Sequence, residues 1–137
     1  MVCTFFGHRD ASDSLVEELR KTLIELLETG NVDVFYIGNS GNFDRLVSSV
    51  LYELSSEYSF TCRIVLAYLP EHETDYNFET ILPEGIENVP KRFAISYRNK
   101  WMIEQSDMVV AYVKRNYGGA YQFKVIAEKK GKKVIEI

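Results

Sequence analysis

Apolar and polar positions follow two alternating patterns along the chain: short continuous apolar runs, and longer stretches with apolar residues at helical spacing. Residues 2–6 form a short apolar run closed by Gly7, which is typical of a strand buried on both faces. Comparable runs predict four further strands, over residues 34–37, 63–69, 108–113 and 133–137.

Helical spacing occupies the stretches between these runs. Leucines at positions 15, 19, 23, 26 and 27 predict a first helix that Gly30 ends, and Ser14 with Glu17 has the spacing of a capping box at its start. Apolar residues at positions 43, 46, 47, 50, 51 and 54 predict a second helix. Two more are expected over residues 93–105 and 120–130, the last opened by Gly118-Gly119 and stopped by Gly131.

Strands and helices therefore alternate from one end of the sequence to the other. This order predicts an α/β protein in which right-handed crossovers place helices on both faces of a parallel sheet. We expect a single-domain Rossmann-like fold over residues 1–137 with a five-stranded parallel sheet. No internal repeat or low-complexity segment is visible.

One segment, residues 70–92, interrupts the alternation. It contains all three prolines (Pro70, Pro83, Pro90) and six acidic residues, Glu71, Glu73, Asp75, Glu79, Glu84 and Glu87. A loop of this length inside a compact domain is commonly functional. We interpret it as a lid beside a ligand crevice, with a surface excursion as the alternative.

Composition narrows the class of protein. The chain has 137 residues, of which 46% are hydrophobic, so it can bury a core without disulfides or a structural metal. Its net charge of −4 argues against binding of nucleic acid through a basic surface. There is no apolar run long enough to span a membrane, and both cysteines, Cys3 and Cys62, lie in apolar runs. Because residues 1–6 lack a basic segment and a long apolar stretch, we expect no signal peptide. We expect a cytoplasmic protein with no membrane partner.

Candidate chemistry lies in three glycine-containing turns, since ligands of open α/β sheets bind beyond the carboxyl ends of the strands. The turns after the first, second and fourth strands each precede a helix whose free amides attract an anion. They favour a phosphate-bearing ligand over a neutral one. The predicted ligand-binding residues are Gly7, His8, Arg9, Gly38, Asn39, Gly41, Asn42, Asp44, Arg98, Gly118 and Gly119.

Each of these turns also has a purely structural interpretation. Any one glycine could simply permit a tight turn, and there is neither GxxxxGK[ST] nor a GxGxxG after the first strand. His8 and Asp10 could take part in acid–base chemistry, but no metal-ligand cluster is readable, and we favour a hydrogen-bonded turn histidine. Asp44 could stabilise the helix dipole or bind a ribose hydroxyl. We expect no cofactor and no metal.

Arg98 is the most informative single residue. Together with Ala94, Ile95 and Met102 it occupies the apolar stripe of its predicted helix. Because a buried guanidinium must be paired, Arg98 meets either a ligand anion or a structural carboxylate. Spacing alone slightly favours the structural pair.

Several of these segments together resemble the SLOG superfamily, most closely its YpsA-like branch. The resemblance rests on Gly7-His8-Arg9-Asp10, the 38–44 turn, Arg98-Asn99-Lys100-Trp101-Met102, Ser106-Asp107 and Gly118-Gly119. It implies a Rossmann-like fold and kinship with the Lonely Guy (LOG) phosphoribohydrolases, which release the base from nucleoside 5′-monophosphates, and with the DNA-processing DprA proteins. Other members are thought to sense nucleotide-derived ligands.

Compared with the LOG motif, the sequence keeps some positions and changes others. Arg98, Met102 and Asp107 keep the first spacings, so Arg98 matches the family's catalytic arginine. Tyr117 replaces a proline, and Val125 stands where the resemblance places the catalytic glutamate. Glu128 lies one turn later, farther from the phosphate end of the helix. The resemblance thus implies phosphate binding more strongly than hydrolysis.

Three function classes remain. The first is a module that binds a nucleotide or nucleotide-derived phosphorylated small molecule, as a sensor. The second is an N-glycosidase acting on a nucleoside 5′-monophosphate, with Arg98, Asp10 or Asp44 as candidate catalytic residues. The third is a single-stranded nucleic-acid binder, which the charge disfavours. A homodimer is compatible with exposed apolar residues on the third helix such as Trp101.

Overall fold

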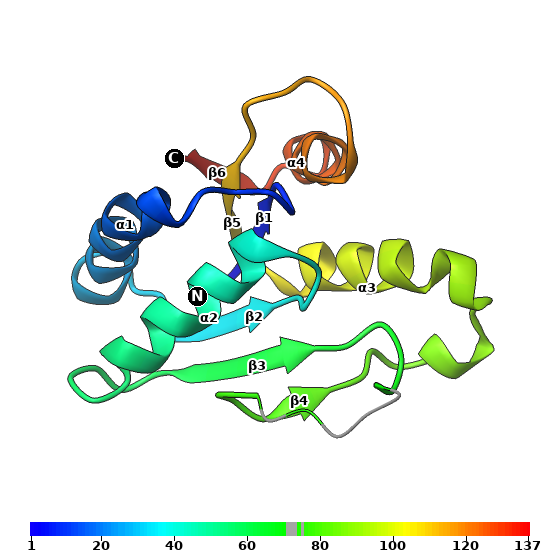
Figure 1. The fold of residues 1–137 in the computed structure, drawn as a ribbon, viewed down its shortest axis with the longest axis horizontal. Helices are drawn as coiled ribbons and strands as arrows, with labels where there is room; N and C mark the ends of the chain where they lie inside the picture. The colour runs from blue at the N-terminus through cyan, green and yellow to red at the C-terminus, as the bar shows by residue number, and fades with distance from the viewer. Residues whose placement is uncertain (71–73, 75) are drawn as a thin grey trace.

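A computed structural model describes residues 1–70, 74 and 76–137 of the chain. All six strands pair in parallel in one sheet of order β4-β3-β2-β1-β5-β6. The strands are β1 Val2–Gly7, β2 Val34–Ile37, β3 Thr61–Val65, β4 Thr80–Ile81, β5 Met108–Tyr112 and β6 Lys133–Glu136. The parallel α/β Rossmann-like fold is therefore confirmed (Figure 1).

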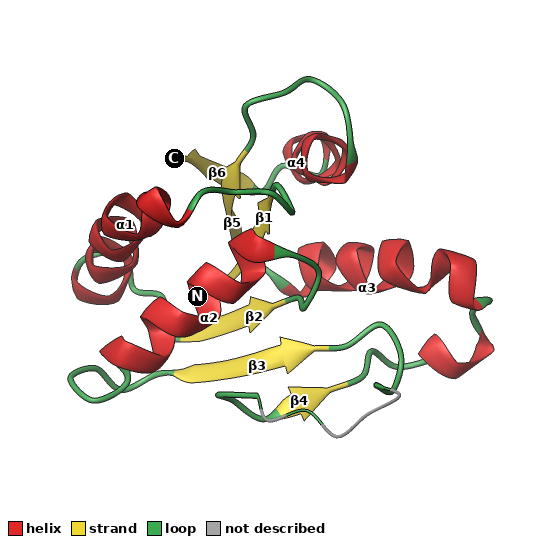
Figure 2. Cartoon of the chain, viewed as in Figure 1, coloured by secondary structure: helices red, strands yellow, loops and turns green. Residues whose placement is uncertain are grey.

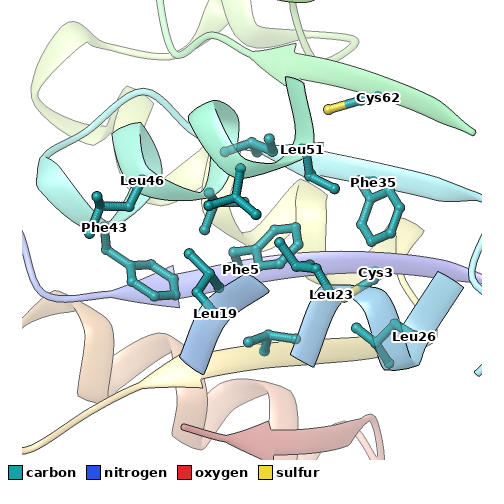
Figure 3. Close-up of a cluster of buried hydrophobic side chains, with 14 of the residues drawn as sticks. Cys3, Phe5, Leu19, Leu23, Leu26, Phe35, Phe43, Leu46, Leu51 and Cys62 are labelled. Atoms are coloured by element: carbon teal, nitrogen blue, oxygen red, sulfur yellow. The ribbon is translucent and has the colours of Figure 1, made fainter. Parts of the chain in front are cut away.

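Four α-helices connect the strands: α1 Val16–Glu28, α2 Asn42–Leu54, α3 Lys91–Gln105 and α4 Gly119–Lys129. Figure 2 shows them packed around the single sheet. On one face the buried side chains of α1 and α2 form a common core with β1 and β2, and Figure 3 shows Leu19, Leu23, Phe5 and Phe35 within it. On the other face Met102 and Phe123 anchor a second core beneath α3 and α4. Cys3 and Cys62 are buried free thiols, as their apolar surroundings predict.

The sheet has six strands rather than five. The extra strand, β4, lies within the segment that the sequence predicts as a loop, and it pairs with the edge of β3. The Ile64 amide donates to the Glu79 carbonyl and the Leu66 amide donates to the Ile81 carbonyl, both at 2.9 Å. A strand of two residues carries no alternating pattern, so the sequence offers no signal for it. The short helix η2, Ile86–Asn88, follows in the same segment. Glu71, His72, Glu73 and Asp75 lie outside the described residues, and the lid remains a prediction.

Two local predictions are wrong. Ser14 does not cap α1, because it lies inside a 3-10 turn, η1 Asp13–Leu15, where its amide donates to the Ser12 hydroxyl at 3.2 Å. Glu17 instead accepts from Arg20 at 2.6 Å. Trp101 is half-buried against Tyr36, with ring centroids 5.3 Å apart, so it is not the exposed apolar residue expected on α3.

The order of the strands decides where a ligand can bind. The chain moves outward from β1 through β2 and β3 to β4, and then α3 returns it to the opposite side of β1, where β5 and β6 follow. The topological switch therefore lies between β1 and β5. The turns that follow β1, β2 and β5 meet beside this switch, at the carboxyl end of the sheet. Within the described residues, no helix has the length and apolar character needed to cross a membrane.

Candidate functional site

Hydrogen bonds join the three glycine-containing turns to one another. The Asn42 amide at the start of α2 donates to the Arg9 carbonyl at 2.9 Å, which links the β1 and β2 turns. On the other side the Lys114 amide donates to Nε2 of His8 at 2.8 Å, which links the β1 and β5 turns. The β1 turn is thus the central member, held from both sides.

His8 is a hydrogen-bonded histidine in the β1 turn, which is the interpretation that the sequence favours. Its ring is buried, and burial together with the nearby Arg115 charge lowers the pKa of the imidazole despite the opposing effect of Asp10. A neutral ring with Nε2 as an acceptor fits the observed bond. Asp10 is exposed and forms a two-pronged ion pair with Arg115, at 3.0 and 3.2 Å, which lowers the pKa of the carboxyl. Nowhere in the described chain do three His, Cys, Asp or Glu residues converge to hold a metal ion.

Two of the predicted glycines are required by packing. A Cβ on Gly7 would overlap the ring of Phe43, so the absence of a side chain there lets α2 approach β1. Gly41 has φ 117°, and its added Cβ would lie 2.6 Å from the Arg9 Cα. Both residues therefore have structural explanations, and Asn42 has another, since its side-chain amide donates to the Ala11 carbonyl and to Asp13.

Arg98, on α3, is hydrogen-bonded to the last residue of β3 and has only 1% of its surface exposed. Its Nη1 donates to Asn39 Oδ1 and to the Val65 carbonyl, both at 2.9 Å, its Nη2 to Ser40 Oγ at 2.8 Å, and its Nε to Asn99 Oδ1 at 2.8 Å. All four acceptors are neutral. Among the described residues no carboxylate forms an ion pair with Arg98, so the structural pair that spacing slightly favours is not observed. One of its five N–H donors remains for a further acceptor.

Burial lowers the pKa of Arg98, and the negative charge of Asp44 opposes this effect. The Asp44 Oδ2 accepts from the Ser40 amide at 2.9 Å, and Gly38 separates it from Arg98. An added Cβ on Gly38 would lie 2.9 Å from Asp44 Oδ2 and 3.2 Å from the Arg98 Cζ, so only a glycine lets both groups approach the backbone here. Burial raises the pKa of Asp44, although the Ser40 amide and the charges of Arg98 and Arg9 oppose this.

Neither α2 nor α4 has a side-chain cap, but the first amide of α2 donates to the Arg9 carbonyl, whereas the start of α4 is open. Gly118 has φ 88°, and no side chain caps the helix, so its first amides lack acceptors within it. Added Cβ atoms on Gly118 and Gly119 would meet nothing within 4 Å. Neither packing nor a positive φ explains a glycine at position 119. Its missing side chain leaves the helix amides accessible.

Two small pockets of about 140 Å³ each share Arg9, Ser40 and Ile95 in their lining, and Arg98 lines the first of them. The first extends over Arg98, Asp44 and Asn99 to Gly119, and the second extends over Asn39 to Ala67 and Tyr68. A wider polar pocket of about 370 Å³ lies against α2, where Asp44, Ser48, Ser49 and Tyr76 line it. Asp44 therefore faces two pockets.

Ser40 and Asn99 are functional candidates that the sequence does not predict. Ser40 lies within the predicted turn, but its importance comes from the Arg98 bond, which spans 58 residues. Because Arg98 donates to the Ser40 oxygen, the hydroxyl hydrogen remains available to an acceptor in the pocket. Val125, which the LOG resemblance aligns with a glutamate, is half-buried, Glu128 is exposed, and neither lines the two small pockets.

Comparison with family models and with curated proteins gave no match to this chain.

Proposed function

We propose that this protein binds a nucleotide or nucleotide-derived phosphorylated small molecule, as a sensing module, at the meeting point of the β1, β2 and β5 turns. The observation that carries the proposal is the buried Arg98 cation, surrounded by neutral acceptors. No carboxylate among the described residues is hydrogen-bonded to this guanidinium, so a bound anion nearby would add a favourable charge interaction with it. The proposal agrees with the resemblance to the SLOG superfamily.

The groups around Arg98 supply the donors that a phosphate needs. Arg9 is exposed and lines both small pockets, so its guanidinium can bind phosphate oxygens in a bidentate manner. The Ser40 hydroxyl and the open amides of α4 add neutral donors. In this arrangement Arg98 is a positioning residue that holds Ser40 and Asn39 and supplies positive charge.

Equilibrium dialysis against a mixed panel of nucleotides and their derivatives, read by mass spectrometry, tests the proposal. The wild type should retain at least one phosphorylated compound unchanged. Arg9→Ala should weaken that retention by about 10-fold or more, since a charge-assisted hydrogen bond contributes about 1.5–3 kcal/mol. Arg92→Ala is the matched control, because Arg92 is also exposed but lines neither pocket. Retention of no panel member, or equal binding by both variants, would contradict the proposal.

A second candidate, an N-glycosidase of nucleoside 5′-monophosphates, is favoured by one observation. Asp44 is a carboxyl with a raised pKa in the same pocket as Arg98, and such a group can stabilise an oxocarbenium-like transition state or donate a proton. If this activity exists, the dialysis yields free base and ribose 5-phosphate. Asp44→Asn, which keeps the Ser40 contact, would then abolish release while ligand retention persists. Release that survives in Asp44→Asn would exclude Asp44 as the catalytic carboxyl.

A further inference from the structure

An apolar pocket of about 370 Å³ opens beyond the carboxyl end of β3, next to the anion-binding groups. Its walls come from the loop after β3, from the segment around η2 and from the first turns of α3. Leu69, Leu82, Ile86 and Val89 dominate the lining, and Glu87 and Lys91 add two charged groups. A mainly apolar lining with a few polar groups is typical of small-molecule sites.

The side chains around this pocket are unusually exposed for their type. Leu69 is 73% exposed, Tyr68 44% and Leu82 41%. Single exposed apolar residues are ordinary, but three around one concave site indicate a surface that a ligand covers. The predicted third strand extends to residue 69, whereas β3 ends at Val65. Tyr68 and Leu69 therefore leave the sheet and turn toward solvent.

Tyr68 joins this pocket to the anion site. It lines the apolar pocket and also the small pocket formed with Arg9, Asn39 and Ser40, and Ala67 lines both as well. The two sites thus share one wall. Lys91 Nζ lies 5.0 Å from the centroid of the Tyr68 ring, a cation–π contact that helps to hold the aromatic ring in place.

Size separates the two parts of the site. The two small pockets that Arg9 and Ser40 line are below the range of about 300–1,000 Å³ that whole ligands occupy, whereas the apolar pocket falls within it. The small pockets can hold the phosphate of a ligand near Arg9 and Ser40 but not the rest of the molecule. Because Tyr68 lines both sites, the rest of the ligand can lie in the adjacent apolar pocket.

We infer that the site selects ligands with a planar aromatic base, which stacks on Tyr68 and enters the apolar pocket while the phosphate lies at Arg9 and Ser40. The inference rests on the proposed function and adds the second half of the ligand to it. An aromatic side chain provides a stacking platform for any base, since every base has a π-face. Ribose 5-phosphate, which lacks the base, should bind more weakly than a nucleoside 5′-monophosphate.

The test measures the affinity of the full chain for the four common nucleoside 5′-monophosphates and for ribose 5-phosphate by calorimetry. Tyr68→Ala should weaken binding of the preferred nucleotide by about 10- to 100-fold, the effect of losing one base–aromatic stack, and should weaken ribose 5-phosphate binding much less. Tyr68→Phe keeps the ring and should bind like the wild type. Circular dichroism confirms that each variant is folded.

The outcomes separate this inference from the proposed function. Nucleotide binding that is equal in the wild type and in Tyr68→Ala would overturn the stacking role while the anion site stands. Equal affinity of the wild type for ribose 5-phosphate and for every nucleotide would do the same. If the wild type binds neither class of compound, the proposed function itself fails and the base subsite fails with it.

Discussion

Replacing Arg98 with methionine should lower the free energy of unfolding. Most of the loss should come from one hydrogen bond, the one that Arg98 donates to the Val65 carbonyl. Methionine keeps most of the aliphatic stem in the apolar stripe of α3 but removes all four donated bonds. Asn39 is exposed, and Ser40 and Asn99 are half-buried, so water can replace the lost donor at these three acceptors. The Val65 carbonyl lies in a buried contact, where an acceptor without a donor costs about 1–3 kcal/mol.

This free energy converts to a measurable shift of the melting temperature. For 137 residues, an unfolding entropy of about 2.1 cal/mol/K per residue gives about 0.29 kcal/mol/K, so 1 kcal/mol corresponds to about 3.5 °C. Arg98→Met should therefore melt about 4–10 °C below the wild type. Lys100→Met is the matched control, because Lys100 lies on the exposed face of the same helix and should change the melting temperature little.

The assay is thermal unfolding followed by circular dichroism, with ligand binding measured well below the transition. Arg98→Met should also weaken retention of the phosphorylated ligand, because Ser40 and Asn39 lose the group that positions them. A melting temperature within about 2 °C of the wild type would refute the reasoning. It would mean that the Val65 carbonyl finds another donor and that the buried cation contributes nothing net to the fold.

Two further changes test the central turn. Gly7→Ala should lower the free energy of unfolding by about 1–3 kcal/mol, because the added Cβ overlaps the Phe43 ring. In Gly119→Ala the added Cβ meets nothing within 4 Å, so this variant should melt near the wild-type temperature and weaken only ligand binding. Equal melting temperatures for the two variants would argue against the packing role of Gly7. Since the folded pKa of His8 lies below its unfolded value of about 6.5, the wild type should lose stability as pH falls through and below that value, as the unfolded chain then binds the additional proton. His8→Gln keeps an acceptor for the Lys114 amide but cannot titrate, so chemical denaturation at pH 8 and pH 5 should show a smaller difference for this variant, and identical differences would exclude the His8 contribution.

The residues of the site divide by the kind of signal that could reveal them. Arg98 was recognisable in advance, because a charged residue at an apolar helix position must be buried and must find partners. The order of strands and helices also predicts the glycine turns at the carboxyl edge of the sheet, where the structure has them. Their individual roles were not recognisable: Gly7 makes room for Phe43, 36 positions later in the chain, whereas Gly119 has no neighbour to accommodate.

The alternation of apolar runs and helical stripes was enough to determine the α/β class, the parallel sheet and the bounds of the main helices to within a few residues. These features depend on local periodicity, which the order of amino acids states directly. The two-residue strand β4, the exposed position of Tyr68 and the partners of Arg98 depend instead on which distant segments pack together. Arg98 donates to Asn39, Ser40 and Val65, which lie 59, 58 and 33 positions away. Only the tertiary structure brings such groups within hydrogen-bonding distance, because no local pattern specifies contacts across that many residues.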